Sequence, residues 1–306
     1  MNIEDGSPIW EYETVGYSDH GVFVSDETIY SPRSSGEMIC IDPESGEELD
    51  RFFVRDGYFG SICISEDVMF FETGFSEEES TQLVCLDLKS QATLWDCEVK
   101  GAINDIVFDE DKVFLFGYAN KDEDVQGWSL LCLQAEDGEE IWDIEGDDNP
   151  GSMAVEGGFI YLSSYGEEVE WHEAEKFCAC IDCDSGSEIW SCGLGVSYRY
   201  GGGSFAVTGD AVYCHSSDGL YCIDSASGEF TWSDNMELIG NLAVGGDYIY
   251  LASENRITCM DKDNGEFMWE WEEAGLSDNI ALSRGKLFVS ASGEDGYDSH
   301  IFCIGE

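Results

Sequence analysis

Basic residues are scarce in this chain of 306 residues, which has 13 lysines and arginines against 66 aspartates and glutamates and a formal net charge of −53. Proteins that bind nucleic acid neutralise its phosphates with a basic surface, so this composition argues against that class. Self-repulsion on this scale destabilises a compact chain in dilute buffer, and concentrated salt screens it. Because the acidic residues are spread over nearly every turn, we expect the cytoplasm of a salt-accumulating halophile. The alternative, an acidic surface that meets a cationic partner, is less favoured.

Long apolar segments are also missing. The sequence has no run of about 18 apolar residues, so we expect no membrane span. The first six residues contain neither a positive region nor an apolar stretch, so we expect no secretory signal. In a chain that is not exported, the 13 cysteines indicate reduced thiols rather than a framework of disulfides.

Helical periodicity and catalytic patterns are absent as well. Apolar residues alternate in short runs and do not recur at helical spacing, which favours strands. The hydrophobic content of 43% is enough for a packed core. The four histidines are dispersed, and no arrangement of serine, histidine and aspartate follows from their spacing. The sequence therefore favours a protein that is not an enzyme, and it predicts no catalytic residues.

What the chain does contain is a hairpin that recurs along its whole length. In the complete form an aspartate ends one strand, a glycine follows four residues later in the turn, and a tryptophan stands four residues further on. Three copies depart from this pattern, because Asp50 replaces the tryptophan in one, Gln91 the glycine in another and Gln134 the aspartate in a third. Residues that recur so regularly indicate a structural role. The closest matches to the pattern are Asp182, Gly186 and Trp190; Asp224, Gly228 and Trp232; and Asp261, Gly265 and Trp269.

A second element, two short strands joined by a polar turn, precedes each hairpin and occurs seven times. Four strands per repeat, with repeats 37 to 48 residues apart, are typical of the blades of a β-propeller. Because the last repeat lacks its fourth strand, we expect residues 8–13 to pair with residues 299–304 and supply it, which removes exposed sheet edges. We predict an all-β, seven-bladed propeller of four-stranded antiparallel blades in a single domain over residues 1–306. The predicted blades are at about residues 21–54, 61–99, 104–145, 152–193, 204–234, 241–272 and 279–304 plus 8–13.

These hairpins resemble the PQQ-like, or quinoprotein-type, β-propeller repeat, whose blades end in an Asp-x-x-x-Gly-x-x-x-Trp pattern, and the resemblance covers essentially the whole chain. The acidic composition resembles that of haloarchaeal proteins. The family includes quinone-dependent dehydrogenases, the outer-membrane assembly lipoprotein and many repeat proteins of unknown role, so the resemblance implies a fold and leaves function open. It also implies that the hairpin tryptophans pack between adjacent blades. In this chain they are Trp10, Trp95, Trp142, Trp190, Trp232 and Trp269.

The resemblance does not favour a quinone-dependent dehydrogenase. Those enzymes typically have eight blades and an adjacent pair of cysteines beneath the cofactor. This chain has seven predicted blades and no Cys-Cys pair. We therefore expect neither an organic cofactor nor a resident metal.

The cysteines that recur in the hairpins favour a packing role, since cysteine is a small residue that is readily buried. Cys178, Cys183 and Cys192 form a sharper case. If Cys180 faces Trp190 across its hairpin, the same register places Cys178 opposite Cys192. Free thiols are the favoured interpretation, and a strained disulfide or a metal site built from these three cysteines stays open.

One asymmetry predicts a binding surface. In a propeller, the loops that join strand two to strand three, and one blade to the next, share one face, here called the long-loop face. In this sequence these loops collect aromatic residues and several of the scarce cations, which interface hot spots favour. The alternative is that these side chains only pack the loops over the blade ends. The predicted contact residues are Arg33, Arg55, Tyr58, Phe59, Trp171, Tyr198, Arg199 and Tyr200.

We accordingly predict a non-catalytic binding or scaffold protein, adapted to high salt, that docks a protein or peptide partner on the long-loop face. The alternative class is a small-ligand binder or an enzyme that uses the central channel of the propeller, where the inner strands present their side chains. Titratable side chains gathered at the mouth of that channel would favour the alternative. The sequence identifies neither the partner nor the oligomeric state.

Overall fold

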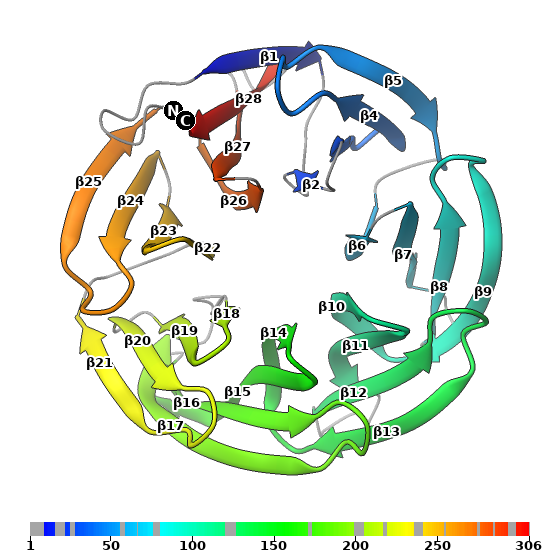
Figure 1. Cartoon of the computed structure of the whole chain (residues 1–306). Coiled ribbons are helices and arrows are strands. Elements are labelled where there is room, and N and C mark those ends of the chain that lie inside the picture. Colours follow the sequence, from blue (N-terminus) through cyan, green and yellow to red (C-terminus); the bar gives the residue numbers. More distant parts are fainter. Residues whose placement is uncertain are drawn as a thin grey trace. The chain divides into compact units, whose positions relative to one another are not determined.

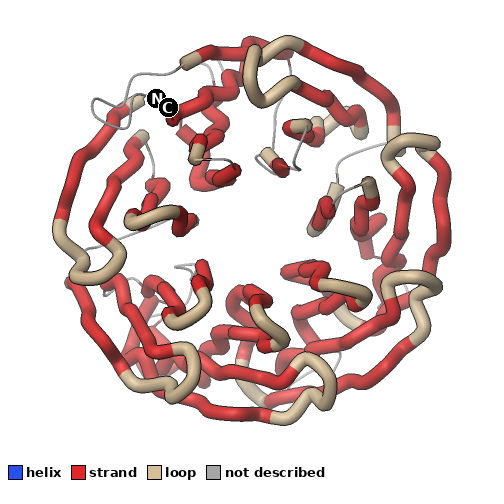
Figure 2. Tube along the Cα trace, viewed as in Figure 1, coloured by secondary structure: helices blue, strands red, loops and turns tan. Residues whose placement is uncertain are grey.

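Strands make up all of the regular secondary structure that is described. The computed structural model describes residues 9–15, 22–24, 28–55, 59–65, 67–75, 80–119, 127–170, 173–198, 205–216, 219–235, 241–253, 255–273, 276–283, 285–292 and 298–305. These residues form 28 strands and no helix (Figure 2). Accordingly, no helix in this part of the chain is long and apolar enough to cross a membrane. The chain divides into two compact units, residues 1–59 with 239–306, and residues 60–238.

The unit of residues 1–59 and 239–306 contains three four-stranded antiparallel blades. Blade one consists of β2 (Phe23–Val24), β3 (Ile29–Pro32), β4 (Glu37–Ile41) and β5 (Glu48–Phe53). Blade six consists of β22 (Leu242–Gly245), β23 (Tyr248–Ser253), β24 (Arg256–Asp261) and β25 (Phe267–Glu272). Blade seven consists of β26 (Leu276–Ser283), β27 (Lys286–Ser292), β28 (Asp298–Gly305) and β1 (Trp10–Val15).

The unit of residues 60–238 contains the other four blades. Blade two consists of β6 (Ile62–Ser65), β7 (Val68–Phe75), β8 (Ser80–Asp87) and β9 (Ala92–Lys100). Blade three consists of β10 (Ala102–Asp109), β11 (Lys112–Ala119), β12 (Gly127–Gln134) and β13 (Glu140–Gly146). Blade four consists of β14 (Asn149–Glu156), β15 (Phe159–Glu170), β16 (Glu173–Asp182) and β17 (Glu188–Tyr198). Blade five consists of β18 (Phe205–Thr208), β19 (Ala211–Ser216), β20 (Gly219–Asp224) and β21 (Phe230–Asp234).

The N-terminal strand supplies the fourth strand of blade seven. β1 pairs antiparallel with β28, from Trp10 opposite Cys303 to Val15 opposite Asp298, which confirms the predicted pairing. The seven sheets, each with its strands in sequence order apart from β1 (Figure 1), confirm the predicted all-β, seven-bladed propeller. The largest departure from the predicted blade boundaries is in blade four, whose last strand continues to Tyr198 instead of ending near residue 193.

Burial follows the position of each strand in its blade. The third strand is covered on both faces, so β4 and β24 are buried almost throughout. The fourth strand is an edge strand, and β25 alternates between exposed and half-buried residues. Adjacent blades pack their apolar faces together, as Phe114 and Phe116 of blade three do with Ile160 and Leu162 of blade four. The core is therefore a series of apolar layers between neighbouring blades.

Where the hairpin pattern is complete, its aspartate holds the turn. The Asp224 carboxylate accepts hydrogen bonds from the N–H and the hydroxyl of Ser227, at 2.9 and 2.7 Å, and these bonds hold its pKa below the usual range. The Gly228 N–H closes the turn by donating to the Asp224 carbonyl at 2.9 Å. A bulge between Cys222 and Ile223 then shifts the register of the two strands, and Trp232 lies opposite Cys222. The hairpin pattern is thus a turn signal with a defined geometry.

The tryptophan of one blade binds the turn of the next blade. The indole N–H of Trp142 donates to the Cys183 carbonyl at 3.0 Å, and that of Trp190 donates to the Ser225 carbonyl at 2.9 Å. Trp95 and Trp10 make the corresponding bonds to the carbonyls of Ala135 and Pro43, at 2.9 and 3.2 Å. Trp269 packs in the apolar cluster shared by blades six and seven, and the ring of Trp232 lies tilted against that of Tyr213 in its own blade.

The turn glycine makes this docking possible for two reasons. Gly228 has φ of +74°, which favours glycine. A Cβ added there would lie 2.7 Å from a ring carbon of Trp190, closer than carbon atoms approach without repulsion. Gly186 repeats the arrangement with φ of +66° and 3.1 Å to Trp142. Gln91 adopts φ of +57° without being glycine, so that turn retains backbone strain.

Candidate functional site

The predicted contact residues of blade one come from two adjoining segments, and two of them are buried. Arg33 and Gly36 belong to the tight turn between β3 and β4, where the Gly36 N–H donates to the Arg33 carbonyl at 2.8 Å. The N–H of Val54 donates to the Gly36 carbonyl at 2.9 Å, which brings the segment of Arg55 against this turn. The side chains of Arg33 and Phe59 are only 2% and 0% exposed. Arg55, in contrast, is half-buried. Of these three described side chains, that of Arg55 is the one exposed to solvent in part.

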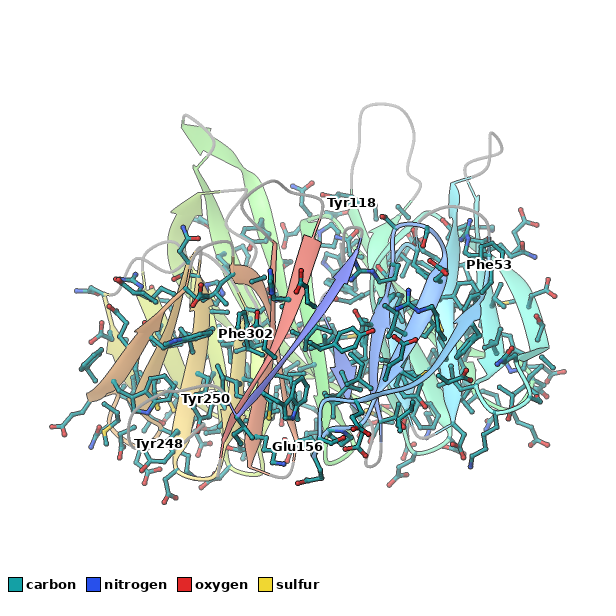
Figure 3. All side chains as sticks on the ribbon, turned by 90° about the horizontal axis from the view of Figure 1, so that it is seen from above. Phe53, Tyr118, Glu156, Tyr248, Tyr250 and Phe302 are labelled. Atoms are coloured by element: carbon teal, nitrogen blue, oxygen red, sulfur yellow. The ribbon has the colours of Figure 1, made fainter. Side chains whose placement is uncertain are left out.

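Of the other predicted contact residues, Tyr198 belongs to an extension of blade four. β15, β16 and β17 contain 12, 10 and 11 residues, against six, six and five in the corresponding strands of blade five. The green ribbon of this blade rises at the upper edge of Figure 3. Tyr198 ends β17 and lies opposite Glu173 of β16. Trp171, Arg199 and Tyr200, and Tyr58 of the first group, lie outside the described residues.

A buried lysine fixes the base of this extension. Lys176 of β16 is 0% exposed, and its ammonium donates to the His215 carbonyl of blade five at 2.6 Å. The same ammonium lies 5.2 Å from the centre of the Tyr165 ring, a distance at which the ring face attracts a cation. A buried charge is costly without partners, so these two contacts tie the extension to the neighbouring blade. Within the described parts of blades four and five, Lys176 is the sole lysine or arginine.

Of the three cysteines considered for a metal site, two lie opposite each other and Cys183 lies elsewhere. Cys178 lies opposite Cys192, and Cys180 lies opposite Trp190, as the register predicted. Cys183, however, packs in the cluster between blades three and four, while Cys178 packs with Cys214 between blades four and five. Side chains alternate between the two faces of a strand, and the turn then carries Cys183 to the other side of the blade. The three predicted cysteines therefore do not converge.

Cys178 instead forms a thiol cluster with Cys192 and Cys214. Hydrogen bonds to both thiols, together with burial, raise the pKa of Cys178, and the bond from Cys178 lowers the pKa of Cys192. Sequence reasoning missed Cys214, because its position on the face toward blade four depends on packing between blades. All 13 cysteines are free thiols. Burial raises the pKa of most of the others, to about 12 for Cys132 and Cys183, so they are protonated at neutral pH, as a packing role requires.

Asp105 is a titratable residue that the sequence prediction did not single out. Its carboxylate, on the first strand of blade three, accepts the Met153 N–H of blade four at 2.8 Å. Burial raises the pKa of this carboxyl to about 6, and the bond from Met153 opposes the rise. The sequence could have pointed to this residue, because Asp105 stands directly before the apolar run Ile106-Val107-Phe108. The contact joins two blades, so Asp105 has a structural task.

The described residues contain no group of three or more histidine, cysteine, aspartate or glutamate side chains placed to hold a metal ion. What they do offer is an extended three-stranded end on blade four, in the unit of residues 60–238. Loops and strand ends on such a scaffold are where proteins usually place binding residues.

Known proteins resemble the chain in sequence pattern and in fold. The pattern of the family described as outer membrane protein assembly factor BamB matches residues 1–95, 72–271 and 175–296. A search of curated protein sequences gave no match. The fold is similar to the crystal structure of the computationally designed Ika8 protein, with a TM-score of 0.65 and 12% identity over 93% of this chain and 82% of that one. It is also similar to the crystal structure of BamB from Moraxella catarrhalis, with a TM-score of 0.57 and 17% identity over 96% of this chain and 84% of that one. At these identities the likeness to solved structures shows the fold alone.

Proposed function

Because this chain belongs to the β-propeller family of the outer membrane protein assembly factor BamB, we propose that it is a non-catalytic binding or scaffold protein that docks a protein or peptide partner on its long-loop face. The observation that carries the proposal is the extension of blade four. Its strands β15, β16 and β17 are longer than the corresponding strands of blade five. The last of them, β17, ends at Tyr198. The shorter strands of blade five show that a four-stranded blade is complete without such an extension, whereas a binding surface gains area from it.

The chemistry of the extension suits a protein partner. β17 is the edge strand of blade four, and an edge strand offers backbone N–H and carbonyl groups to an added strand. The sequence places Trp171 in the two-residue link between β15 and β16, and Arg199 and Tyr200 directly after β17. Tryptophan, tyrosine and arginine are the residues that most often dominate the binding energy of protein interfaces.

A pull-down in molar KCl tests the proposal. Wild-type protein is compared with Arg55→Ala plus Arg199→Ala, and with Trp171→Ala plus Tyr198→Ala. The matched control is Lys89→Ala plus Lys262→Ala, which removes the same charge as the arginine pair from turns at the opposite ends of the strands. We expect both long-loop variants to lose partner recovery and the control to keep it. Unchanged recovery in both long-loop variants contradicts the proposed face.

We also propose that the protein works at high salt in the cytoplasm of a halophile, on the basis of its net charge of −53. At molar salt the Debye length is about 3 Å, so repulsion between surface carboxylates is largely screened. Dialysis into low salt is therefore expected to unfold the protein, as measured by loss of its β-sheet circular dichroism. Full thermal stability in low salt would refute this part of the proposal.

A further inference from the structure

A cavity of about 310 Å³ lies between blades four and five, at the end of the blades opposite to the extension. Its lining includes the buried side chains of Tyr161 and Cys180, and the more open side chains of Phe159 and Ile189. Phe159 is 37% exposed and Ile189 51% exposed, and the position of Ile189, just before the hairpin tryptophan, is also exposed in other blades, as at Leu94 and Ile141. Glu156 also lines the cavity and is labelled at the lower edge of Figure 3.

Two other junctions between blades carry an ion pair at the positions that border this cavity. At the junction of blades three and four, Lys112 at the start of β11 forms an ion pair with Asp184 in the next turn, at 3.1 Å. At the junction of blades seven and one, Lys286 at the start of β27 pairs in the same way with Glu44, at 2.6 Å. The corresponding positions at the junction of blades four and five are Phe159, at the start of β15, and Ala226. Phe159 and Ala226 carry no charge, so these two described positions form no ion pair, and both line the cavity.

The backbone around the cavity leaves it open. Gly157 and Gly209 are among its lining residues, and a Cβ added at either glycine would meet nothing within 4 Å. In blade three, the turn that corresponds to Gly157 carries Glu110 and Asp111. Side chains that border the neighbouring junction are thus missing here.

The surroundings of the cavity are strongly acidic. The turns of blades four and five at this end, residues 156–159, 182–189, 208–211 and 224–230, contain seven acidic residues and no lysine or arginine. Glu156 accepts the Gly209 N–H at 3.1 Å, and a carboxylate has lone pairs for further donors. The charge that complements this apolar hollow is therefore positive.

We propose that this cavity is a docking site for a cationic peptide segment, which inserts one bulky apolar side chain between Phe159 and Ile189 while flanking lysines or arginines face the surrounding carboxylates. The site goes beyond the proposed function, because it lies at the other end of the blades and uses none of the long-loop residues. A second copy of the chain does not suit the site, since it would bring another net charge of −53 against an acidic surface.

The test measures binding of two fluorescein-labelled peptides by anisotropy in molar KCl, where long-range attraction between charges is screened. One peptide has a leucine with two lysines on each side, and the other has glycine in place of the leucine. Burying a leucine side chain contributes about 1.5–3 kcal/mol, so the leucine peptide is expected to bind at least about tenfold more tightly.

The decisive variant is Phe159→Lys with Ala226→Asp, which installs the ion pair of the neighbouring junction and leaves the net charge unchanged. It is expected to bind the leucine peptide at least about tenfold more weakly than the wild type. The matched control is Leu94→Lys with Ala92→Asp, which makes the same chemical changes at exposed positions of β9 and keeps wild-type affinity. If the double variant fails to fold, Ala226→Leu fills the cavity by a single change at an exposed position and is expected to weaken binding to the same degree.

Three results overturn the proposal. The first is equal affinity of the wild type for the two peptides. The second is wild-type affinity in the cavity variant. The third is a wild-type dimer in sedimentation equilibrium that the cavity variant abolishes, which would make a second copy the occupant. Because the pull-down variants lie at the opposite end of the blades, neither experiment depends on the outcome of the other.

Discussion

The junction of blades three and four and the junction of blades four and five share one device and differ in another. Both use a tryptophan whose indole N–H binds the next turn, Trp142 in the first case and Trp190 in the second. They differ at the rim, where Lys112 and Asp184 form an ion pair and Phe159 with Ala226 leaves a cavity. The shared device holds blades together, and the position that varies is free to acquire binding.

The largest effect is expected for the shared device. Trp142→Ala and Trp190→Ala each remove a large ring and its bond to the next blade, and each is expected to lower the free energy of unfolding by about 3 kcal/mol. The measurement is chemical denaturation in molar KCl. Equal losses support a common structural role. A loss at Trp190 far smaller than at Trp142 would show that the open junction does not rely on its tryptophan.

The turn glycines sharpen the comparison. Gly228→Ala places a Cβ 2.7 Å from the Trp190 ring, and Gly186→Ala places one 3.1 Å from the Trp142 ring. Both turns also force alanine into positive φ. We expect losses of about 2 kcal/mol for Gly228→Ala and about 1 kcal/mol for Gly186→Ala, again by chemical denaturation. The reverse order would contradict the role of the close approach.

At the junction of blades three and four, a pH effect is expected from Asp105. The folded-state pKa of Asp105, about 6, lies above its value of about 3.9 in an unfolded chain. The folded protein therefore binds the proton more tightly, and the stability due to Asp105 is present below about pH 4 and lost as pH rises toward 6. Ser152 takes the corresponding place in blade four and does not titrate.

Asp105→Asn removes this titration. The variant is expected to gain stability relative to the wild type as pH rises from about 4 to 6, on the order of 1 kcal/mol. Denaturation midpoints in molar KCl, taken as differences from the wild type at each pH, cancel the general effect of the other carboxylates. A difference that is independent of pH would contradict the raised pKa.

The smallest effect is expected for the ion pair at the rim. Asp184 is 85% exposed, and exposed pairs contribute about 1 kcal/mol or less. Asp184→Ala is expected to cost less than about 0.5 kcal/mol in molar KCl, where salt screens the pair. A loss as large as that of Trp142→Ala would mean that the rim carries stability and is not free to vary.

Repetition explains why the fold was predictable. Gly228 and Trp232 have counterparts at the same spacing in other blades, and so many matches are not expected by chance. The spacing of these residues also gives the strand boundaries within a few residues. The extension of blade four was missed because its sequence, Glu167-Glu168-Val169-Glu170, lacks the alternation of apolar and polar residues that predicts a half-buried strand.

The binding surface was less predictable because burial depends on three-dimensional packing. Arg33 and Phe59 have residue types that favour interfaces, yet both are covered by the surrounding structure. The cavity arises from two positions in different blades, Phe159 and Ala226. Lys112 and Asp184 occupy the corresponding positions of the neighbouring junction and form an ion pair there. The absence of this pair at Phe159 and Ala226 could be recognised only after the structure had shown it.

The most direct test of the account is amide hydrogen exchange of the protein alone and with the partner recovered in the pull-down, both in molar KCl. The account predicts added protection in the blade-four extension, at residues 165–176 and 193–198, with the repeated turn at residues 261–265 unchanged. Added protection at the repeated turns, with none in the extension, would contradict the claim that the repeated residues hold the blades and the departures from the repeat bind the partner.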